Sequence, residues 1–372
     1  MPSEGGASGL WLRGAPVKGR FAETGKKGAG ELDQKSEVIL DVQHLKTYFL
    51  SGKHNETEMR ASDDLSYQVR RGEFVAIVGE SGSGKSVSAL SVMGLIPYPP
   101  GLVVDGRILF HGRDLLEAGD EEIRQIRGAK ISMIFQEPST ALNPVVTIGR
   151  QIAEAIRIHE KGVSKSEAMN RAIELLGKVN IPNPEVRAKQ YPFELSGGMQ
   201  QRAMIAMAMS CNPEILICDE PTTALDVTVQ AQVLEQLNSL RQEFGTALIL
   251  ITHNLGVVAR YADSVKVMYG GKIIEEGDPT AIFENPHHPY TLGLIRAVPR
   301  LDLPRSYGLN AIEGEPPDMS KIPPESCAFA GRCRYATDVC RQRRPQLEPV
   351  EDGHLCACFH QDETEQERRE LV

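Results

Sequence analysis

The chain has 372 residues and carries 41 lysines and arginines against 50 aspartates and glutamates, so its net charge at pH 7 is −9. An acidic balance argues against a nucleic-acid binder that rests on a basic face. No stretch approaches the run of about 18 apolar residues that a transmembrane helix needs, and the N-terminus lacks the apolar region of a signal peptide. We therefore expect a cytosolic protein of about two domains.

The first segment, residues 1–36, is rich in Gly, Ser, Ala and Lys and has little apolar periodicity. This composition predicts a disordered N-terminal tail. A membrane-touching segment around residues 10–13 (Leu-Trp-Leu-Arg) is the alternative, but so short an apolar patch buries little area.

Apolar, β-branched runs predict strands at residues 38–42, 45–49 and 65–69, with a polar loop at 51–60. Tyr48 and Phe49 belong to the second of these runs. One of the two rings could stack on a purine base, which is worth roughly 1–3 kcal/mol. Ordinary core packing is the alternative.

The motif around which the chain is organised is G-x-x-x-x-G-K-[ST] at residues 79–86, between a predicted strand (73–78) and a predicted helix (87–95). Its glycines let successive backbone N–H groups point into one concavity, to which the helix N-terminus adds its positive dipole end. Lys85 is expected to reach the β- and γ-phosphates, and the Ser86 hydroxyl to ligate Mg²⁺. The motif therefore predicts nucleoside triphosphate binding.

Further along the chain we predict a strand at 106–112, a short charged helix at 121–127 and a strand at 131–135 that ends at Gln136. A polar amide at the carboxyl end of a parallel strand lies where α/β sheets bind ligands. Residues 148–159 and 165–179 then predict an all-helical insertion.

A serine and two glycines, Ser196-Gly197-Gly198, precede a helix predicted to run to Cys211. Ser196 can cap this helix, and the glycines expose N–H groups that would make a second anion site. A glycine-rich helix start without a ligand is the alternative.

Two more predicted strands end in polar side chains. The apolar run 215–218 is followed by Asp219, which can hold Mg²⁺ through water, and Glu220, which can polarise an attacking water. Acids that simply lie at the surface are the alternative. The run 247–252 is followed by His253, at a strand end beside the phosphate site.

In order and spacing, these motifs resemble the ATP-binding cassette (ABC) ATPases over residues 37 to about 278. The resemblance implies that Phe49 stacks on adenine, that Gln136 contacts Mg²⁺ and that Glu220 is the general base. It also implies that His253 senses the γ-phosphate and that Asp226 crosses a dimer interface. The implied ATP contacts are Phe49, Gly79, Ser81, Gly82, Ser83, Gly84, Lys85, Ser86 and Val87, and the implied Mg²⁺ ligands are Ser86, Gln136 and Asp219. The implied signature that closes over ATP on an opposite subunit is Ser196, Gly197, Gly198 and Gln200.

The segments 278–291, 298–301 and 312–317 resemble the extension of the oligopeptide/dipeptide permease ATPases. His287 and His288 could be metal ligands, but their proline-flanked run favours a docking turn. Residues 361–372 are charged and predict a solvated tail.

Five cysteines crowd into the C-terminal region, which in a reducing compartment favours a metal site over disulfides. Their spacing is not C-x-x-C, so the residues themselves leave metal binding open. By resemblance to the subfamily, Cys327, Cys333, Cys340 and Cys358 would hold a [4Fe–4S] cluster. Cys356 is a fifth candidate, and zinc or free thiols are the alternatives.

The expected fold is an α/β P-loop ABC domain with a RecA-like core, an antiparallel β subdomain and a helical subdomain at about 137–212. A small cysteine-containing C-terminal domain, residues 279–360, would follow. The resemblance implies an ATPase subunit of a bacterial peptide importer on the cytoplasmic side of the inner membrane. Its implied partners are two transmembrane permease subunits, a second ATPase subunit and an extracytoplasmic substrate-binding protein, with no nucleic acid. An ABC-type ATPase of DNA repair or translation, and an importer of nickel or another small solute, are the alternatives.

Overall fold

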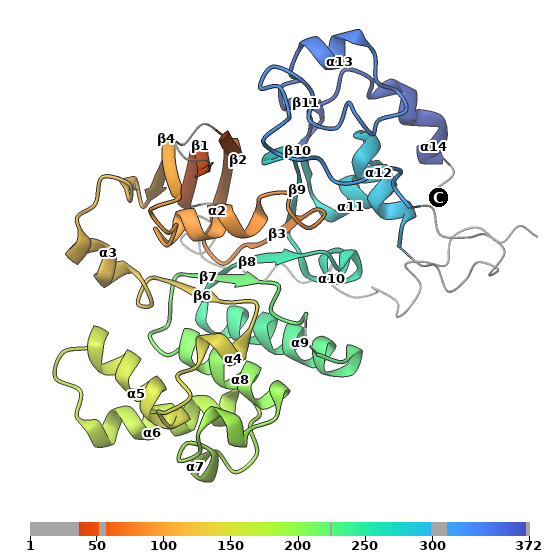
Figure 1. Ribbon diagram of the computed structural model, residues 1–372. Helices are drawn as coiled ribbons and strands as arrows, with labels where there is room; N and C mark the ends of the chain where they lie inside the picture. The colour runs from red at the N-terminus through yellow and green to blue at the C-terminus, as the bar shows by residue number, and fades with distance from the viewer. Residues whose placement is uncertain (1–36, 52–56, 224, 299–310, 370–372) are drawn as a thin grey trace, which may run out of the picture.

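The structure is a computed structural model that describes residues 37–51, 57–223, 225–298 and 311–369. Two sheets lie at its centre: one of four strands in the order β2-β1-β4-β5, and one of eight strands in the order β11-β12-β10-β9-β3-β8-β7-β6 (Figure 1). The predicted tail at 1–36 lies outside the described residues. The strands are β1 (Val38–Ser51), β2 (Thr57–Arg70), β3 (Phe74–Val78), β4 (Gly101–Phe110), β5 (Arg113–Asp114), β6 (Ile131–Ile134), β7 (Ile215–Asp219), β8 (Ala247–Thr252), β9 (Ser264–Tyr269), β10 (Lys272–Gly277), β11 (Glu348–Glu351) and β12 (His354–Cys356).

The four-stranded sheet is antiparallel, and one of its faces is exposed to solvent. In the second half of β2, Leu65, Tyr67 and Val69 are buried while the residues between them are exposed, because successive side chains point to opposite faces. The two predicted runs 38–42 and 45–49 form a single strand, β1, whose pairing shifts between Val42 and Leu45. A shift of register lets one strand continue through a stretch that breaks the alternation.

The centre of the larger sheet is parallel, in the order β9-β3-β8-β7-β6. Every residue of β3, β6, β7 and β8 is buried, as expected of parallel strands covered on both faces. The carboxyl ends of these strands therefore meet at one edge, where the predicted site residues follow them.

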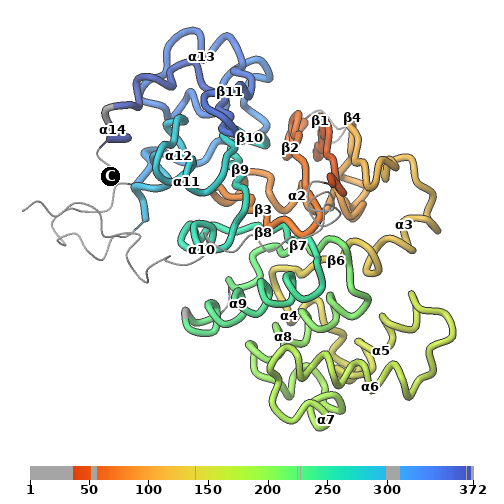
Figure 2. Tube along the Cα trace, turned by 180° about the vertical axis from the view of Figure 1, so that it is seen from behind, coloured from red at the N-terminus to blue at the C-terminus, as the bar shows by residue number. Residues whose placement is uncertain are grey.

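Helices cover the sheet and build the end of the molecule opposite the C-terminal region (Figure 2). Isoleucines 148, 152 and 156 are buried on one stripe of α5, at the spacing of an amphipathic helix. The predicted helix 148–159 is confirmed, and the helix after Ser196 ends at residue 208 rather than 211. The helices are α2 (Lys85–Val92), α3 (Asp120–Ile126), α4 (Pro138–Ala141), α5 (Ile148–His159), α6 (Lys165–Lys178), α7 (Pro184–Arg187), α8 (Gly197–Ala208), α9 (Val227–Phe244), α10 (Leu255–Tyr261), α11 (Pro279–Glu284), α12 (Pro289–Arg296), α13 (Asp338–Gln342) and α14 (Glu365–Arg369), with short 3₁₀ helices η1 (Pro192–Glu194) and η3 (Asp362–Thr364).

The C-terminal region adds strands to the same sheet, because β12 pairs with β10, with Cys356 opposite Glu275. Its aromatic core is Tyr269, Tyr290 and Phe329, whose ring centroids lie 4.6 to 5.5 Å apart. None of the helices among the described residues is both long and apolar enough to cross a membrane.

The charged end does not stay fully solvated as expected. Thr364 is fully buried, and Glu367 bonds to Arg296, Arg334 and Tyr335. Charge composition alone predicted a free tail, but these partners lie 32 to 71 residues away in the chain, so that no local pattern reveals them.

Candidate functional site

The phosphate loop folds as its motif requires, between β3 and α2. Gly79, Gly82 and Gly84 have φ of +152°, +80° and +99°, a range that favours glycine. A Cβ on Gly79 would lie 2.2 Å from a carbonyl oxygen of β9, and one on Gly84 would lie 2.0 Å from the Ala61 carbonyl oxygen. Gly84 also caps α2 without a side-chain bond, so the first N–H groups of this helix remain available to an anion.

The side chain of Lys85 folds back onto the phosphate loop. Its Nζ donates to the carbonyl oxygens of Gly79 and Glu80, at 2.9 and 2.8 Å, and lies 3.4 Å from Ser83 Oγ. Burial lowers the pKa of Lys85, an effect that the carboxylates of Glu220, Asp219 and Glu80 oppose. A buried ammonium held on carbonyl oxygens is ready to transfer its bonds to phosphate oxygens.

The predicted Mg²⁺ pair is joined in the structure. Ser86, at the start of α2, donates its hydroxyl to Asp219 Oδ1 at 2.9 Å, although 133 residues separate them. Burial raises the pKa of Asp219, the bond from Ser86 opposes that rise, and the charge of Glu220 adds to it. A hydroxyl and a carboxylate are the oxygen ligands that Mg²⁺ prefers, so these residues fit the ion.

The other three polar side chains predicted at strand ends converge on one carboxylate. Glu220 accepts a hydrogen bond from Gln136 Nε2 at 3.2 Å and from Thr223 at 2.9 Å, and His253 Nδ1 lies 3.4 Å from its other oxygen. Glu220 has φ of +44°, a left-handed conformation that costs a non-glycine residue of order 1 kcal/mol or more. Glu220 directly follows Asp219 in the chain, and its carboxylate contacts side chains at the ends of β6 and β8.

The predicted signature lies on a different element. Ser196 Oγ accepts a bond from the N–H of Met199 at the start of α8, at 3.4 Å, and Ser196 and Gly197 are exposed. Gln200 donates to the carbonyl oxygens of Pro192 and Leu195. Among the described residues no hydrogen bond joins this helix start to the phosphate loop.

Two further predicted residues lie on other elements. Asp226 is exposed and caps α9 by accepting from the N–H of Val229 at 3.0 Å. Phe49 is half-buried near the end of β1, opposite Gly101 of β4. Its neighbour Tyr48 donates to Asp63 at 2.9 Å.

Sequence reasoning missed the outer support of the phosphate loop. The N–H of Glu80 donates to Tyr290 Oη at 2.8 Å, and Arg332 donates to the Glu80 carboxylate with two nitrogens, at 2.6 and 3.2 Å. Arg332 stands beside Cys333 and also contacts the Tyr269 hydroxyl at 3.4 Å. The pattern gives no signal for these contacts, because 252 residues separate Glu80 from Arg332.

The five C-terminal cysteines are free thiols. Burial, together with the charges of Cys327, Cys333 and Cys340, raises the pKa of Cys358 to about 12. Cys356 differs, because the first charged group that acts on its thiol is Glu275 rather than another cysteine.

Comparisons with known proteins agree with this geometry. The family model described as "ABC transporter" matches residues 62–223, and the model for the C-terminal region of oligopeptide/dipeptide transporters matches residues 274–340. The chain is 49% identical over 327 residues to the dipeptide transport ATP-binding protein DppD of Bacillus subtilis, covering 88% of this chain and 96% of that protein. It is 47% identical over 336 residues to the oligopeptide transport ATP-binding protein OppD of the same organism, covering 90% and 92%.

A solved structure has the same cassette fold. It is the dimeric ATP-binding cassette MJ0796 in a post-hydrolysis state bound to ADP and Pi, which is 27% identical and aligns with a TM-score of 0.58 over 65% of this chain and 99% of that one. The expected cassette fold and family are thereby confirmed. This chain belongs to the ATP-hydrolysing subunits of the ABC transporters, in the branch that carries the oligopeptide/dipeptide transporter C-terminal region.

Proposed function

We propose that this chain is the energy-coupling ATPase of a peptide importer, and that its ATP site is the one described above. The observation that carries the proposal is the convergence of Gln136 and His253 on Glu220, directly beside the Ser86–Asp219 bond. The relatives named as dipeptide and oligopeptide transport proteins support peptide as the cargo.

In the proposed reaction, Lys85 exchanges the loop carbonyls for β- and γ-phosphate oxygens. Glu220 orients the attacking water and accepts its proton, and His253 contacts the γ-phosphate. Mg²⁺, held by Ser86 and Asp219 with Gln136 as the third candidate, would neutralise charge on the phosphate oxygens. Phe49 would stack on adenine.

The exposed start of α8 supports the pairing of this subunit with a second ATPase subunit. Its exposed N–H groups and the hydroxyl of Ser196 make an anion site without a ligand from its own phosphate loop. A second ATPase subunit, identical or homologous, would present its nucleotide to this site and meet Asp226. Such a pair of subunits would bind two ATP molecules, each between the phosphate loop of one subunit and the signature of the other.

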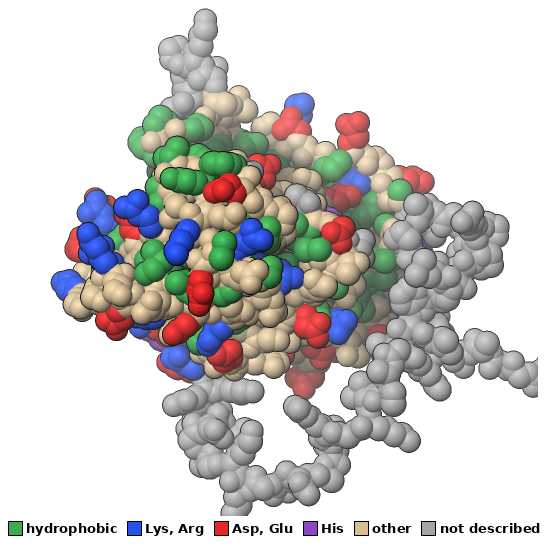
Figure 3. Space-filling view, turned by 90° about the horizontal axis from the view of Figure 1, so that it is seen from below, with side chains coloured by type: hydrophobic (Ala, Val, Ile, Leu, Met, Phe, Trp, Pro, Cys, Tyr) green, Lys and Arg blue, Asp and Glu red, His purple; other side chains and the backbone are tan. Residues whose placement is uncertain are grey.

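Permease subunits are the proposed partners of the helical end. Figure 3 shows that end with apolar side chains between interspersed charges of both signs. Exposed apolar side chains of this size mark interaction surfaces when they gather. In the helical segment 137–212 the exposed large apolar side chains are those of Val145, Ile158, Val186, Tyr191 and Phe193. Docking there would hold the subunit on the cytoplasmic side of the membrane, opposite an extracytoplasmic substrate-binding protein.

We also propose that Cys327, Cys333, Cys340 and Cys358 hold a [4Fe–4S] cluster in a C-terminal domain spanning 279–360. The charges of Cys327, Cys333 and Cys340 all act on the Cys358 thiol, which supports these four residues as one set. Iron and sulfide analysis after anaerobic purification tests this assignment, and a colourless protein with four free thiols would refute it.

The ATPase assignment is tested with Glu220→Gln. We expect turnover to fall at least about 100-fold, while the variant binds ATP and accumulates as a dimer on size exclusion. Glu235→Gln, an exposed change on α9, is the matched control and should behave as the parent. Parental turnover in Glu220→Gln would refute the base assignment.

The importer assignment is tested by what stimulates the ATPase. Proteoliposomes that contain the permease subunits and a peptide-loaded binding protein should accelerate hydrolysis, whereas DNA and ribosomes should not. Stimulation by nickel-loaded binding protein alone would replace peptide by nickel as the cargo.

A further inference from the structure

Three side chains with metal-binding atoms meet where the C-terminal hairpin packs on the segment before α12. They are His287, Glu351 at the end of β11 and His354 at the start of β12, and their ligating atoms all lie within 4.8 Å of one another. The two imidazole rings lie edge to face, with centroids 5.0 Å apart. This meeting was not predicted, because Glu351 lies 64 positions after His287 and only His288 stands beside it in the sequence.

His354 supplies the observation that points to a ligand. It is fully buried, its Nε2 lies 2.9 Å from Glu275 Oε1, and its Nδ1 has no hydrogen-bond partner among the residues that the structure describes. Glu275 also accepts the backbone N–H groups of His287 and His288. A carboxylate that accepts from Nε2–H leaves the lone pair of Nδ1 free, and an unsatisfied buried polar atom costs about 1–3 kcal/mol. Histidine held in this way by a carboxylate is the usual arrangement behind a metal ligand.

His287 and Glu351 complete a set of two nitrogens and one oxygen. His287 contributes one of the nitrogens, and it stands among the charged groups of Arg368, Glu275 and Glu351. Its Nε2 lies 3.7 Å from Glu351 Oε1. Asn285 holds the same carboxylate by a bond of 2.7 Å.

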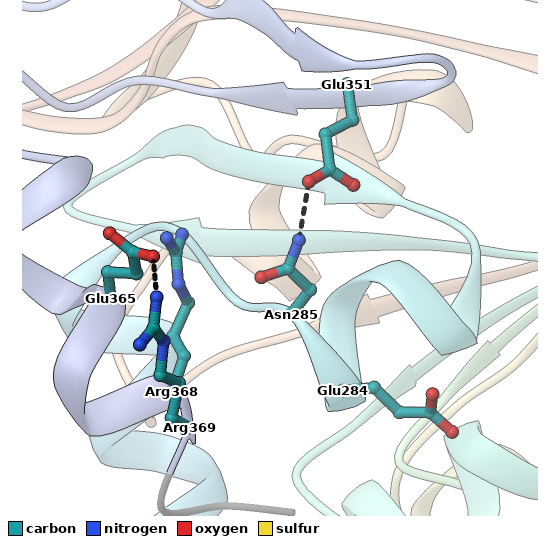
Figure 4. Close-up of a pocket in the computed structure, with 6 residues that line it drawn as sticks. All are labelled: Glu284, Asn285, Glu351, Glu365, Arg368 and Arg369. Atoms are coloured by element: carbon teal, nitrogen blue, oxygen red, sulfur yellow. Dashed lines mark hydrogen bonds and ion pairs between the residues drawn. The ribbon is translucent and has the colours of Figure 1, made fainter.

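The positive charge beside His287 in this structure is the guanidinium of Arg368. Arg368 of α14 donates to His287 Nδ1 at 2.5 Å. It lines an open cavity of about 300 Å³ with Asn285, Glu351, Glu284 and its neighbours on α14 (Figure 4). The cavity gives an ion and its waters a path to Glu351, which is 53% exposed. When Nδ1 accepts from Arg368, the proton of His287 lies on Nε2. An ion on Nε2 must therefore displace that proton to Nδ1 and break the contact with Arg368.

We propose that His287, His354 and Glu351 bind a divalent ion of the zinc and nickel class, in competition with Arg368. Two imidazoles and one carboxylate suit these ions, and water from the cavity would fill the remaining positions. The site shares no residue with the proposed Mg²⁺ ligands, whose candidate atoms are oxygens, or with the set of Cys327, Cys333, Cys340 and Cys358. It requires neither of them.

The test uses the full chain and Zn²⁺ as the probe, titrated against a chromophoric chelator. Glu351→Gln and His287→Asn should each weaken Zn²⁺ binding by at least about tenfold, and both changes leave the buried His354–Glu275 pair intact. Arg368→Gln should strengthen binding, because it removes the competing cation. His44→Gln removes a histidine that is 77% exposed and far along the chain, and it should leave the affinity unchanged.

Co²⁺ in place of Zn²⁺ separates this site from the cysteines, since nitrogen and oxygen ligands give visible bands without thiolate charge transfer. The proposal is refuted if the first two variants bind Zn²⁺ as His44→Gln does. It is also refuted if Arg368→Gln fails to tighten binding, or if the Co²⁺ spectrum reports thiolate ligands alone.

Discussion

The bond between Arg332 and Glu80 links the C-terminal region to the phosphate loop, and Arg332→Gln tests how much the loop depends on it. The Arg332 side chain is 8% exposed and the Glu80 carboxylate 25% exposed, and two nitrogens meet two oxygens. Breaking a fully buried pair from one side costs about 3–5 kcal/mol. Because Glu80 keeps part of its hydration, we expect a loss of about 2–3 kcal/mol in the free energy of unfolding.

Part of that loss should appear in nucleotide affinity, because Glu80 also gives its carbonyl oxygen to Lys85 and its N–H to Tyr290. If about 1.4 kcal/mol acts on the loop, the dissociation constant for ATP rises about tenfold. Binding of a fluorescent ATP analogue and the midpoint of thermal unfolding, measured on the same sample, report the two effects. The matched control is Arg334→Gln, two residues away with a side chain 63% exposed.

A double-mutant cycle identifies the pair itself. Glu80→Gln removes the charge that Arg332 satisfies, so the double variant should be less damaged than the sum of the two single variants. The reasoning is wrong if Arg332→Gln matches Arg334→Gln in both ATP affinity and thermal midpoint, or if the two single effects simply add.

Three other predictions concern Gly84, Phe49 and Asp63. Gly84→Ala should abolish ATP binding, because the new Cβ would lie 2.0 Å from a carbonyl oxygen at φ of +99°; retained affinity in an equilibrium binding assay would contradict the steric argument. Phe49→Ser should weaken ATP binding by roughly 1–3 kcal/mol if its ring stacks on adenine, while Tyr48→Phe should not, and equal affinities would remove Phe49 from the site. Burial raises the pKa of Asp63, but bonds from Lys272 and Tyr48 lower it to below its ordinary value; its stabilisation is therefore present above the unfolded-state pKa near 3.8 and lost as pH falls through the folded-state value. Asp63→Asn should flatten acid unfolding in that range, and an unchanged pH profile would contradict this sign.

The positions of the candidate site residues could be predicted from the sequence better than the contacts that support them. Asp219, Glu220, Gln136 and His253 could be placed because each ends an apolar run, and parallel strands align their carboxyl ends at one edge of a sheet. Glycines 79 and 84 could be predicted because a positive φ leaves a strong local signal.

Contacts between distant segments left no such signal. Arg332 on Glu80, Glu367 on Arg296, and His354 near His287 each join segments more than 60 residues apart, and the side chains involved are ordinary surface types. Strand bounds were missed for a related reason. β2 begins at Thr57 rather than at residue 65 because β1 pairs with it along its whole length, and tertiary pairing overrides the polar composition of its first half.

The pairing of β12 with β10 has a consequence for how the chain can be divided. A protein cut after residue 278 would contain every predicted ATP contact, yet β10 would lose β12 on one side and expose the edge that pairs with it. Such an edge recruits strands from other molecules, so the shortened protein should self-associate through its sheet. The β11–β12 hairpin would then protect this edge from aggregation, which ties solubility to residues outside the predicted ATP contacts.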